Sequence, residues 1–262
     1  MLSGLLMAAH TANATTLRVG GTGSSLGLLA QVGGAFAAAS GDAVKVEVVP
    51  SLGSSGAIRA LADGKLNLAV SARPLKPAEA ARGLKVVLTL RTPFVLATSH
   101  PQPQQLKTAE LPKIFNGERS VWTDGSTIRL ILRPRSETDT ILLGDMAPGM
   151  KQVIEAARRR AEIPIAATDQ ENLAMTQRAP GSLTGTTLTQ LTTEPNNLHT
   201  IPIDGVEPTL ATLESGAYRF EKKLYFALGD KSTPEARKFI AFLTSPQGLK
   251  ALRAAAVLPD KR

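Results

Sequence analysis

The chain has 262 residues, of which 43% are hydrophobic and 20% charged, enough to bury a core as one large domain or two smaller ones. It contains no cysteine, which excludes disulfides, thiolate metal sites and cysteine nucleophiles. The net charge is +8, but basic residues are scattered and aromatic residues make up only 4%, so a nucleic-acid partner is not expected. No motif for a cofactor or a metal ion is present, and neither is expected.

The first fourteen residues are typical of an export signal. An apolar run, residues 2–9, precedes Ala12-Asn13-Ala14, the small-x-small pattern that a signal peptidase cuts. No lysine or arginine precedes the apolar run, as a signal normally has, and the alternative is a short apolar N-terminus that docks in the core. We expect export with cleavage after Ala14. No later stretch approaches the ~18 apolar residues that span a bilayer, so no membrane insertion is expected.

The N-terminal part alternates expected strands and helices. Strands are predicted at residues 16–20, 44–49 and 66–70, and helices at residues 25–39 and 55–63. Helices of this length between strands indicate βαβ units and a parallel sheet, hence an α/β fold.

Two apolar strands, at residues 94–99 and 223–228, are expected to carry the chain between two lobes. The first crossing lies near Thr92, after another strand at residues 85–90, and the strand at residues 223–228 makes the return. This divides the chain into lobe 1, residues 15–92 with 220–262, and lobe 2, residues 93–219.

Lobe 2 and the C-terminus read as mostly helical. Helices are expected at 111–115, 138–143, 149–162, 170–177, 209–215, 234–244 and 246–255, with strands at 128–132 and 163–167 and a strand and turn at 181–191. The run Arg158-Arg159-Arg160 is expected to be a solvated helix face.

Four loops at strand ends carry serine, threonine or arginine. They are residues 21–25, 53–56, 71–73 and 133–138. Open α/β sheets bind ligands at the carboxyl ends of their strands, helix N-termini favour anions, and arginine forks and hydroxyls suit an oxyanion. Singly, each loop could be a turn, a helix cap or surface charge, and the first lacks the third glycine of a dinucleotide-binding loop. Their coincidence favours one oxyanion site.

These residues also resemble a known family. The chain is similar to the solute-binding proteins of phosphate ABC transporters over most of residues 15–262. The matching pieces, in order, are residues 21–25, 53–58, 71–79, 122–125, Arg133 with 136–138, 180–182, 204–209 and 216–225.

The resemblance implies a type II periplasmic-binding fold, in which two lobes joined by a two-strand hinge close on an anion. It also implies a monomer in the periplasm that delivers a phosphate-like ligand to an ABC permease. The family's ligand contacts fall on Ser25, the N–H of Leu26, Ser54, Ser71, Arg133, Ser136 and Thr138. Arg73 and Glu137, which lie in the same loops, complete the expected ligand-binding set.

Two positions depart from the family pattern. Ala72 stands where some phosphate binders have an aspartate that accepts the proton of hydrogen phosphate, and Glu137 interrupts the serine-glycine-threonine signature. Glu137 could cap the following helix or turn inward and accept the ligand's proton in place of that aspartate.

Two other functions remain open at this point. A sensory or adhesion subunit would keep the binding fold and pass ligand occupancy to a signalling partner. An enzyme on this fold would need a cysteine-linked cofactor, which the chain cannot hold, or a serine–histidine pair for which His199 is the one plausible base. We therefore expect a binding protein and not an enzyme.

Overall fold

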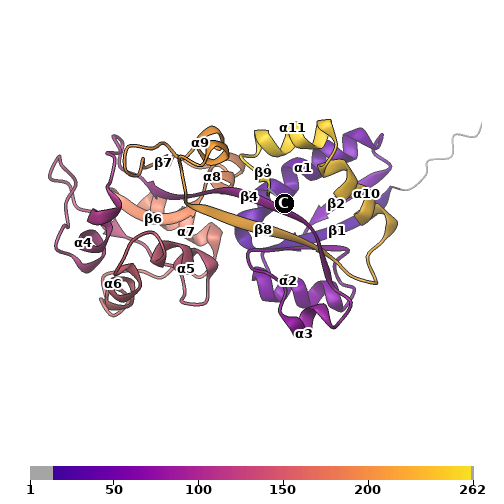
Figure 1. Ribbon diagram of the computed structural model, residues 1–262, viewed down its shortest axis with the longest axis horizontal. Helices are drawn as coiled ribbons and strands as arrows, with labels where there is room; N and C mark the ends of the chain where they lie inside the picture. Colours follow the sequence, from indigo (N-terminus) through magenta and orange to yellow (C-terminus); the bar gives the residue numbers. More distant parts are fainter. Residues whose placement is uncertain (1–13, 261–262) are drawn as a thin grey trace, which may run out of the picture.

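The computed structural model describes residues 14–260. The expected export signal lies outside the described residues, except for Ala14, which is exposed. Within residues 14–260 no helix is long and apolar enough to cross a bilayer. Figure 1 shows an elongated molecule whose elements gather at two ends, with β4 (Lys85–Thr98) and β8 (Glu221–Leu228) running from one end to the other.

Lobe 1 is a sheet with helices on both faces. Strands β2 (Val44–Val48) and β3 (Leu68–Ser71) lie parallel to β1 (Thr15–Gly21) on its two sides. One face is covered by α1 (Leu26–Ala39), α10 (Pro234–Leu243) and α11 (Pro246–Ala254), and the other by α2 (Gly53–Ala62) and α3 (Pro77–Ala80), as Figure 1 shows. Except for α3, all these elements match the sequence prediction to within a few residues.

The two strands expected on either side of Thr92 are a single strand, β4 (Lys85–Thr98). Strand β8 (Glu221–Leu228) runs antiparallel to it, from the pair Lys85–Leu228 to the pair Pro93–Glu221. Pro93 has no N–H to donate, but the next N–H, that of Phe94, bonds to the Phe220 carbonyl at 3.0 Å. Pro93 therefore does not end the strand. A short strand, β9 (Leu258–Pro259), also pairs with β4.

Lobe 2 contains shorter elements. In chain order they are α4 (Leu111–Asn116), β5 (Arg129–Leu130), α5 (Thr138–Gly144), α6 (Met150–Ala157), α7 (Asp169–Arg178), β6 (Ser182–Thr187), α8 (Leu188–Thr193), β7 (His199–Thr200) and α9 (Leu210–Ser215). The expected strand at residues 128–132 shrinks to β5, and that at 163–167 to one bridge between Ile165 and Leu132.

The arginine run does not form the solvated helix face that was expected. Helix α6 ends at Ala157, before the run begins. The Arg158 side chain is only 7% exposed and bonds Glu155 and Thr140, because the chain turns back over α5 at this point. Of the three arginines only Arg159 is exposed.

Separate cores, one in lobe 2 and two in lobe 1, support the two-lobe architecture. The lobe 2 core consists of residues between 94 and 218 and includes Trp122 and Tyr218, both about 2% exposed or less. In lobe 1, one core draws on β1, β3, β8, α1 and the C-terminal helices, and a smaller one lies between the sheet and α2 and includes Ile58 and Leu61. The strand order is β2-β1-β3-β8-β4-β6-β5, so pairing continues through β4 from one lobe into the other. The predicted fold class, α/β with two lobes and a two-strand connection, is confirmed; the lobe boundaries at 92 and 220 stay a prediction.

Candidate functional site

The three lobe 1 loops meet at one edge of the sheet. The N–H of Thr22, after β1, donates to the carbonyl of Val70 at the end of β3 at 3.0 Å. The N–H of Ala72, after β3, donates to Ser54 Oγ at the start of α2 at 2.9 Å. Because β1, β2 and β3 are parallel, the three loops lie together at the carboxyl ends of these strands, where the sequence analysis expects the anion to bind.

The turn before α1 keeps its own donors largely occupied. Ser25 is fully buried, and its Oγ donates to the Thr22 carbonyl at 2.8 Å instead of capping the helix. The N–H of Leu26 donates to the Gly23 carbonyl. The neighbouring Ser24 is 1% exposed, and its Oγ is buried without a hydrogen-bond partner. Ser24, which is not among the expected ligand contacts, is thus the unoccupied hydroxyl of this turn.

The loop after β3 is braced by its own side chains. Ser71 Oγ donates to the Arg73 carbonyl at 2.7 Å and accepts the Arg73 N–H at 3.1 Å. The Arg73 guanidinium bonds both carboxylate oxygens of Glu79, at 2.9 and 2.7 Å, and Ser55 Oγ at 3.0 Å. The bond from Arg73 lowers the pKa of the Glu79 carboxyl to about 2. Arg73 therefore bonds Glu79 and Ser55 in this structure, and its expected role in ligand binding stays a prediction.

Arg133 is the buried cation of lobe 2. It follows β5 and is 5% exposed. Its Nη1 donates to the Ala166 carbonyl at 2.6 Å, and its Nη2 lies 3.4 Å from Asp169 Oδ2 and 3.5 Å from Glu137 Oε2. Its Nε is buried without a partner. Arg133 is one of the ligand contacts that the family resemblance implies, and in this structure it already has two carboxylate neighbours.

The other residues predicted in this loop are more exposed. Glu137 precedes α5, but its side chain makes no capping bond and instead pairs with Arg133 at 35% exposure. The hydroxyls of Ser136, which is exposed, and Thr138 make no hydrogen bond to the described part of the chain. Arg135 is 71% exposed and pairs with Glu155, as expected for a solvated residue.

Sequence reasoning missed a buried ion pair beside this loop. Lys222 on β8 and Asp139 in the first turn of α5 are 2% and 4% exposed at their side chains, and they form an ion pair. Burial raises the pKa of the Asp139 carboxyl, while Lys222 acts in the opposite direction. Lys222 lies just before the strand expected at residues 223–228, and nothing in the sequence distinguishes it from a solvated lysine, so only the topology identifies it.

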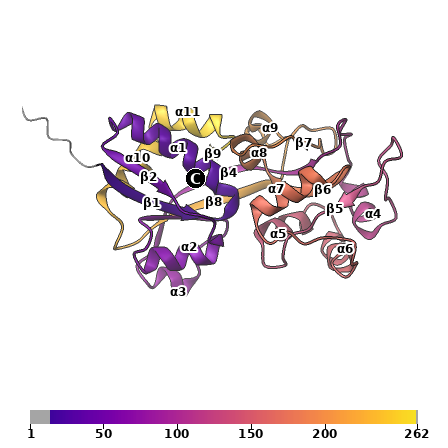
Figure 2. The same cartoon turned by 180° about the vertical axis from the view of Figure 1, so that it is seen from behind.

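Asp169 was missed as well, and it joins the two lobes. Its carboxylate, 4% exposed in the first turn of α7, lies so close to Gly23 that a Cβ at that position would collide with it. Gln170 Nε2 donates to the Gly23 carbonyl at 2.9 Å and to Glu194 Oε1 at 3.0 Å. Burial raises the pKa of the Glu194 carboxyl. Figure 2 shows α7 and α8 beside the lobe 1 elements, so the two halves of the site are in contact.

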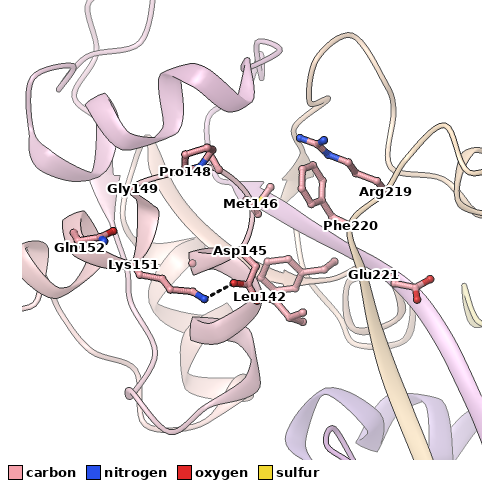
Figure 3. Close-up of a pocket in the computed structure, with 13 residues that line it drawn as sticks. Leu142, Asp145, Met146, Pro148, Gly149, Lys151, Gln152, Arg219, Phe220 and Glu221 are labelled. Atoms are coloured by element: carbon pink, nitrogen blue, oxygen red, sulfur yellow. Dashed lines mark ion pairs between the residues drawn. The ribbon is translucent and has the colours of Figure 1, made fainter.

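A separate cavity of about 700 Å³ lies near the start of β8. Figure 3 shows Met146 and Pro148 on one side and Phe220 and Glu221 on the other, with Lys151 paired to Asp145 at 2.7 Å. None of the predicted site residues lines it. It is therefore distinct from the anion loops.

Two features bear on catalysis and metal binding. His199 is exposed on β7 and bonds no serine among the described residues. Within residues 14–260 no three histidine, aspartate or glutamate side chains are grouped to hold a metal ion.

Comparison with known proteins places the chain in a family. No curated protein matches it in sequence. Among solved structures, a candidate phosphate ABC transporter substrate-binding protein with bound phosphate from Clostridium perfringens superimposes with a TM-score of 0.71 at 18% identity, covering 94% of this chain and all of the other. A phosphate-binding protein from Stenotrophomonas maltophilia gives 0.66 at 13% identity, covering 95% and 91% of the two chains.

An ABC-type phosphate transport receptor from Vibrio cholerae gives 0.60 at 15% identity, covering 94% of this chain and all of the receptor. At these identities the likeness establishes the fold. The sequence profile described as the PBP superfamily domain matches residues 7–247, most of the chain. The chain belongs to the PBP superfamily and has the type II periplasmic-binding fold.

Proposed function

We propose that this protein captures a small oxyanion, phosphate or a phosphate-like ion, by closure of its two lobes and presents it to an ABC importer. The observation that carries the proposal is the meeting of two complementary half-sites. Lobe 1 contributes the Gly23–Ser25 turn with the unpartnered Ser24 Oγ, and lobe 2 contributes Arg133 with its unpartnered Nε. Buried donors without partners are costly, and an oxyanion would satisfy both.

The fold neighbours support transport over the sensory or adhesion alternative. The proteins from C. perfringens and V. cholerae are both described as components of phosphate transport, and the first was solved with phosphate bound. Export to the periplasm, with removal of residues 1–14, and a permease as partner belong to the same proposal. So does the absence of catalysis, since His199, the one plausible base, lies at the surface.

Calorimetric titration tests the proposal. The purified protein is unfolded and refolded to remove any retained anion, then titrated with phosphate, sulfate and acetate near neutral pH. We expect one oxyanion per chain. Binding of no oxyanion at all would contradict the proposal and favour the sensory or adhesion function.

A further inference from the structure

Another cavity, of about 480 Å³, lies in lobe 2 beside β5, the last strand of the sheet. Figure 2 shows β5, α4 and α6 toward the end of lobe 2 that is remote from lobe 1. No residue of the four expected anion loops lines this cavity. Its volume falls within the range of about 300–1,000 Å³ that is typical of small-molecule sites. The cavity is therefore large enough to hold a ligand of its own.

One wall of the cavity is the free edge of β5. The N–H groups of Arg129 and Ile131 donate toward β6, so Leu130, between them, directs its N–H away from β6 and toward the cavity that it lines. Neighbouring segments accept the N–H groups of Ile128 and Leu132, at 2.8 and 3.0 Å. The open stretch is thus one residue long, which is too short for an added strand. It suits a single acceptor group of a small ligand.

The charged side chains around the cavity favour an anion. Arg119, Arg129 and Arg160 line it, and of the described lining residues only Glu162, at 72% exposure, is a carboxylate. Arg119 is neutralised by Glu110, which lies outside the cavity, at 2.6 Å. Arg129 bonds one backbone carbonyl and forms no ion pair within residues 14–260. The Nε of Arg160 is buried without a hydrogen-bond partner, 3.7 Å from Glu162. Two guanidinium groups thus have donors left for an anion.

The remaining lining is largely apolar. Ile114, Ile128 and Ile163, all members of the lobe 2 core, line the cavity together with Leu130 and Pro164. An inorganic oxyanion would leave this apolar surface in contact with water, whereas a ligand with an apolar body would cover it. Small-molecule sites commonly combine such a lining with a few polar groups that fix the orientation of the ligand. The cavity therefore fits an organic anion better than an inorganic one.

We propose that this cavity is a second ligand site, which binds a small organic anion with an apolar body. The anionic group accepts hydrogen bonds from the guanidinium groups of Arg129 and Arg160 and from the N–H of Leu130. The apolar body packs against the isoleucine side chains. Because none of the expected anion loops lines the cavity, this site is separate from the oxyanion site between the lobes and does not depend on it.

Two dyes that share an aromatic body test the proposal. Anilinonaphthalene sulfonate carries an anionic group and phenylnaphthylamine lacks it, and both fluoresce more strongly in apolar surroundings. Each dye is titrated into the wild type, Arg129→Gln and Arg160→Gln. Arg159→Gln is the matched control, because Arg159 is exposed and lines neither this cavity nor the one near the start of β8. Arg219→Gln is the control for that other cavity.

The wild type should bind the sulfonate dye at least about tenfold more tightly than the uncharged dye, the worth of a hydrogen bond to a charged group. Arg129→Gln and Arg160→Gln should each weaken binding of the sulfonate dye by about tenfold and leave that of the uncharged dye within about twofold. Arg159→Gln and Arg219→Gln should change neither affinity. The amide signal of Leu130 in nuclear magnetic resonance spectra should shift as the sulfonate dye binds, and saturating phosphate should not displace the dye.

Two results with the wild type alone would overturn the inference, so it does not depend on whether a variant folds. They are sulfonate binding no tighter than that of the uncharged dye, or absent, and a Leu130 amide signal that stays in place at saturation. Unchanged sulfonate binding in both folded arginine variants would do the same. Displacement of the dye by phosphate would assign it to the oxyanion site, which contradicts the inference while the proposed function stands. If the protein binds the dye as described but no oxyanion, the proposed function fails and the inference stands.

Discussion

The lobe 1 loops of the site are held by hydroxyls that bond neighbouring backbone groups, whereas the charged half, in lobe 2 and at the start of β8, consists of buried ion pairs. Ser25, Ser54 and Ser71 each bond a neighbouring backbone group. Arg133 and Lys222, by contrast, are balanced by Asp169 and Asp139. A neutral hydroxyl loses little when buried with a partner, but a buried charge that loses its partner is strongly destabilising. Changes to these buried charges should therefore have much larger effects than changes to the lobe 1 hydroxyls.

The largest effect on stability is expected at Lys222. Lys222→Met leaves Asp139 buried without its cation and should lower the free energy of unfolding by about 3–5 kcal/mol. Urea unfolding followed by circular dichroism measures this. Combining it with Asp139→Leu should restore most of the loss, because both charges are then removed.

The matched control for that comparison is Lys223→Met. Lys223 is 40% exposed and pairs with Asp260 at 2.8 Å, so its loss should change stability by no more than about 1 kcal/mol. If both lysine variants unfold at the same urea concentration, the Lys222–Asp139 pair does not stabilise the fold as described.

Arg133→Ala should have the largest effect on binding. Removing this buried cation should weaken phosphate binding by about 2–4 kcal/mol in calorimetry, as loss of one partner of a buried charge-assisted contact does. Arg135→Ala is the control, because Arg135 is 71% exposed and should leave the dissociation constant nearly unchanged. An unchanged constant for Arg133→Ala would place the anion elsewhere.

A smaller effect is expected in lobe 1. Ser54→Ala removes the acceptor for the Ala72 N–H and should lower stability by about 1 kcal/mol, a typical value for one hydrogen bond. Ser136→Ala removes an exposed hydroxyl that makes no hydrogen bond within residues 14–260, so it should leave the free energy of unfolding unchanged. A loss at Ser54 as large as that at Lys222 would contradict the contrast between the two halves.

The smallest effect depends on pH. Arg73 lowers the pKa of Glu79 to about 2, from an ordinary value near 4.5. A carboxyl whose pKa is lowered by folding stabilises the folded state at pH values above its ordinary pKa, and this contribution disappears as the pH falls toward 2. Since the pair is about one-fifth exposed, Glu79→Gln should cost less than about 1 kcal/mol near neutral pH. The difference from wild type, followed by thermal unfolding, should vanish on acidification; a difference that grew would contradict the pairing.

The sequence predicted lobe 1 well because its signals are local. The glycine and serine loops directly follow the strands that position them, so one stretch of chain carries both the element and the site. Residues 94–99 were predicted as a separate strand because Pro93 normally interrupts pairing, and the antiparallel partner that accommodates it is more than a hundred residues away.

In the charged half, Arg133 and Glu137 were expected from the sequence, but Asp169, Lys222 and Asp139 escaped prediction because their partners are distant in the chain. Asp169 lies 36 residues after Arg133, and Lys222 lies 83 residues after Asp139. No local pattern distinguishes such a lysine or aspartate from a solvated one, since only the fold buries them. The buried Arg158 was misjudged for the same reason.

The central claim is that an oxyanion closes the two lobes upon each other. Because the chain has no cysteine, Arg59→Cys on α2 and Gln152→Cys on α6, both at exposed positions, can carry a spin-label pair without further changes. Pulsed electron spin resonance then gives the distance distribution between the lobes before and after phosphate is added to the anion-free protein. We predict that phosphate shortens and narrows the distribution, and that Arg133→Ala in the same labelled protein abolishes the change. A distribution that phosphate leaves unaltered in the protein with Arg133 intact would contradict the account.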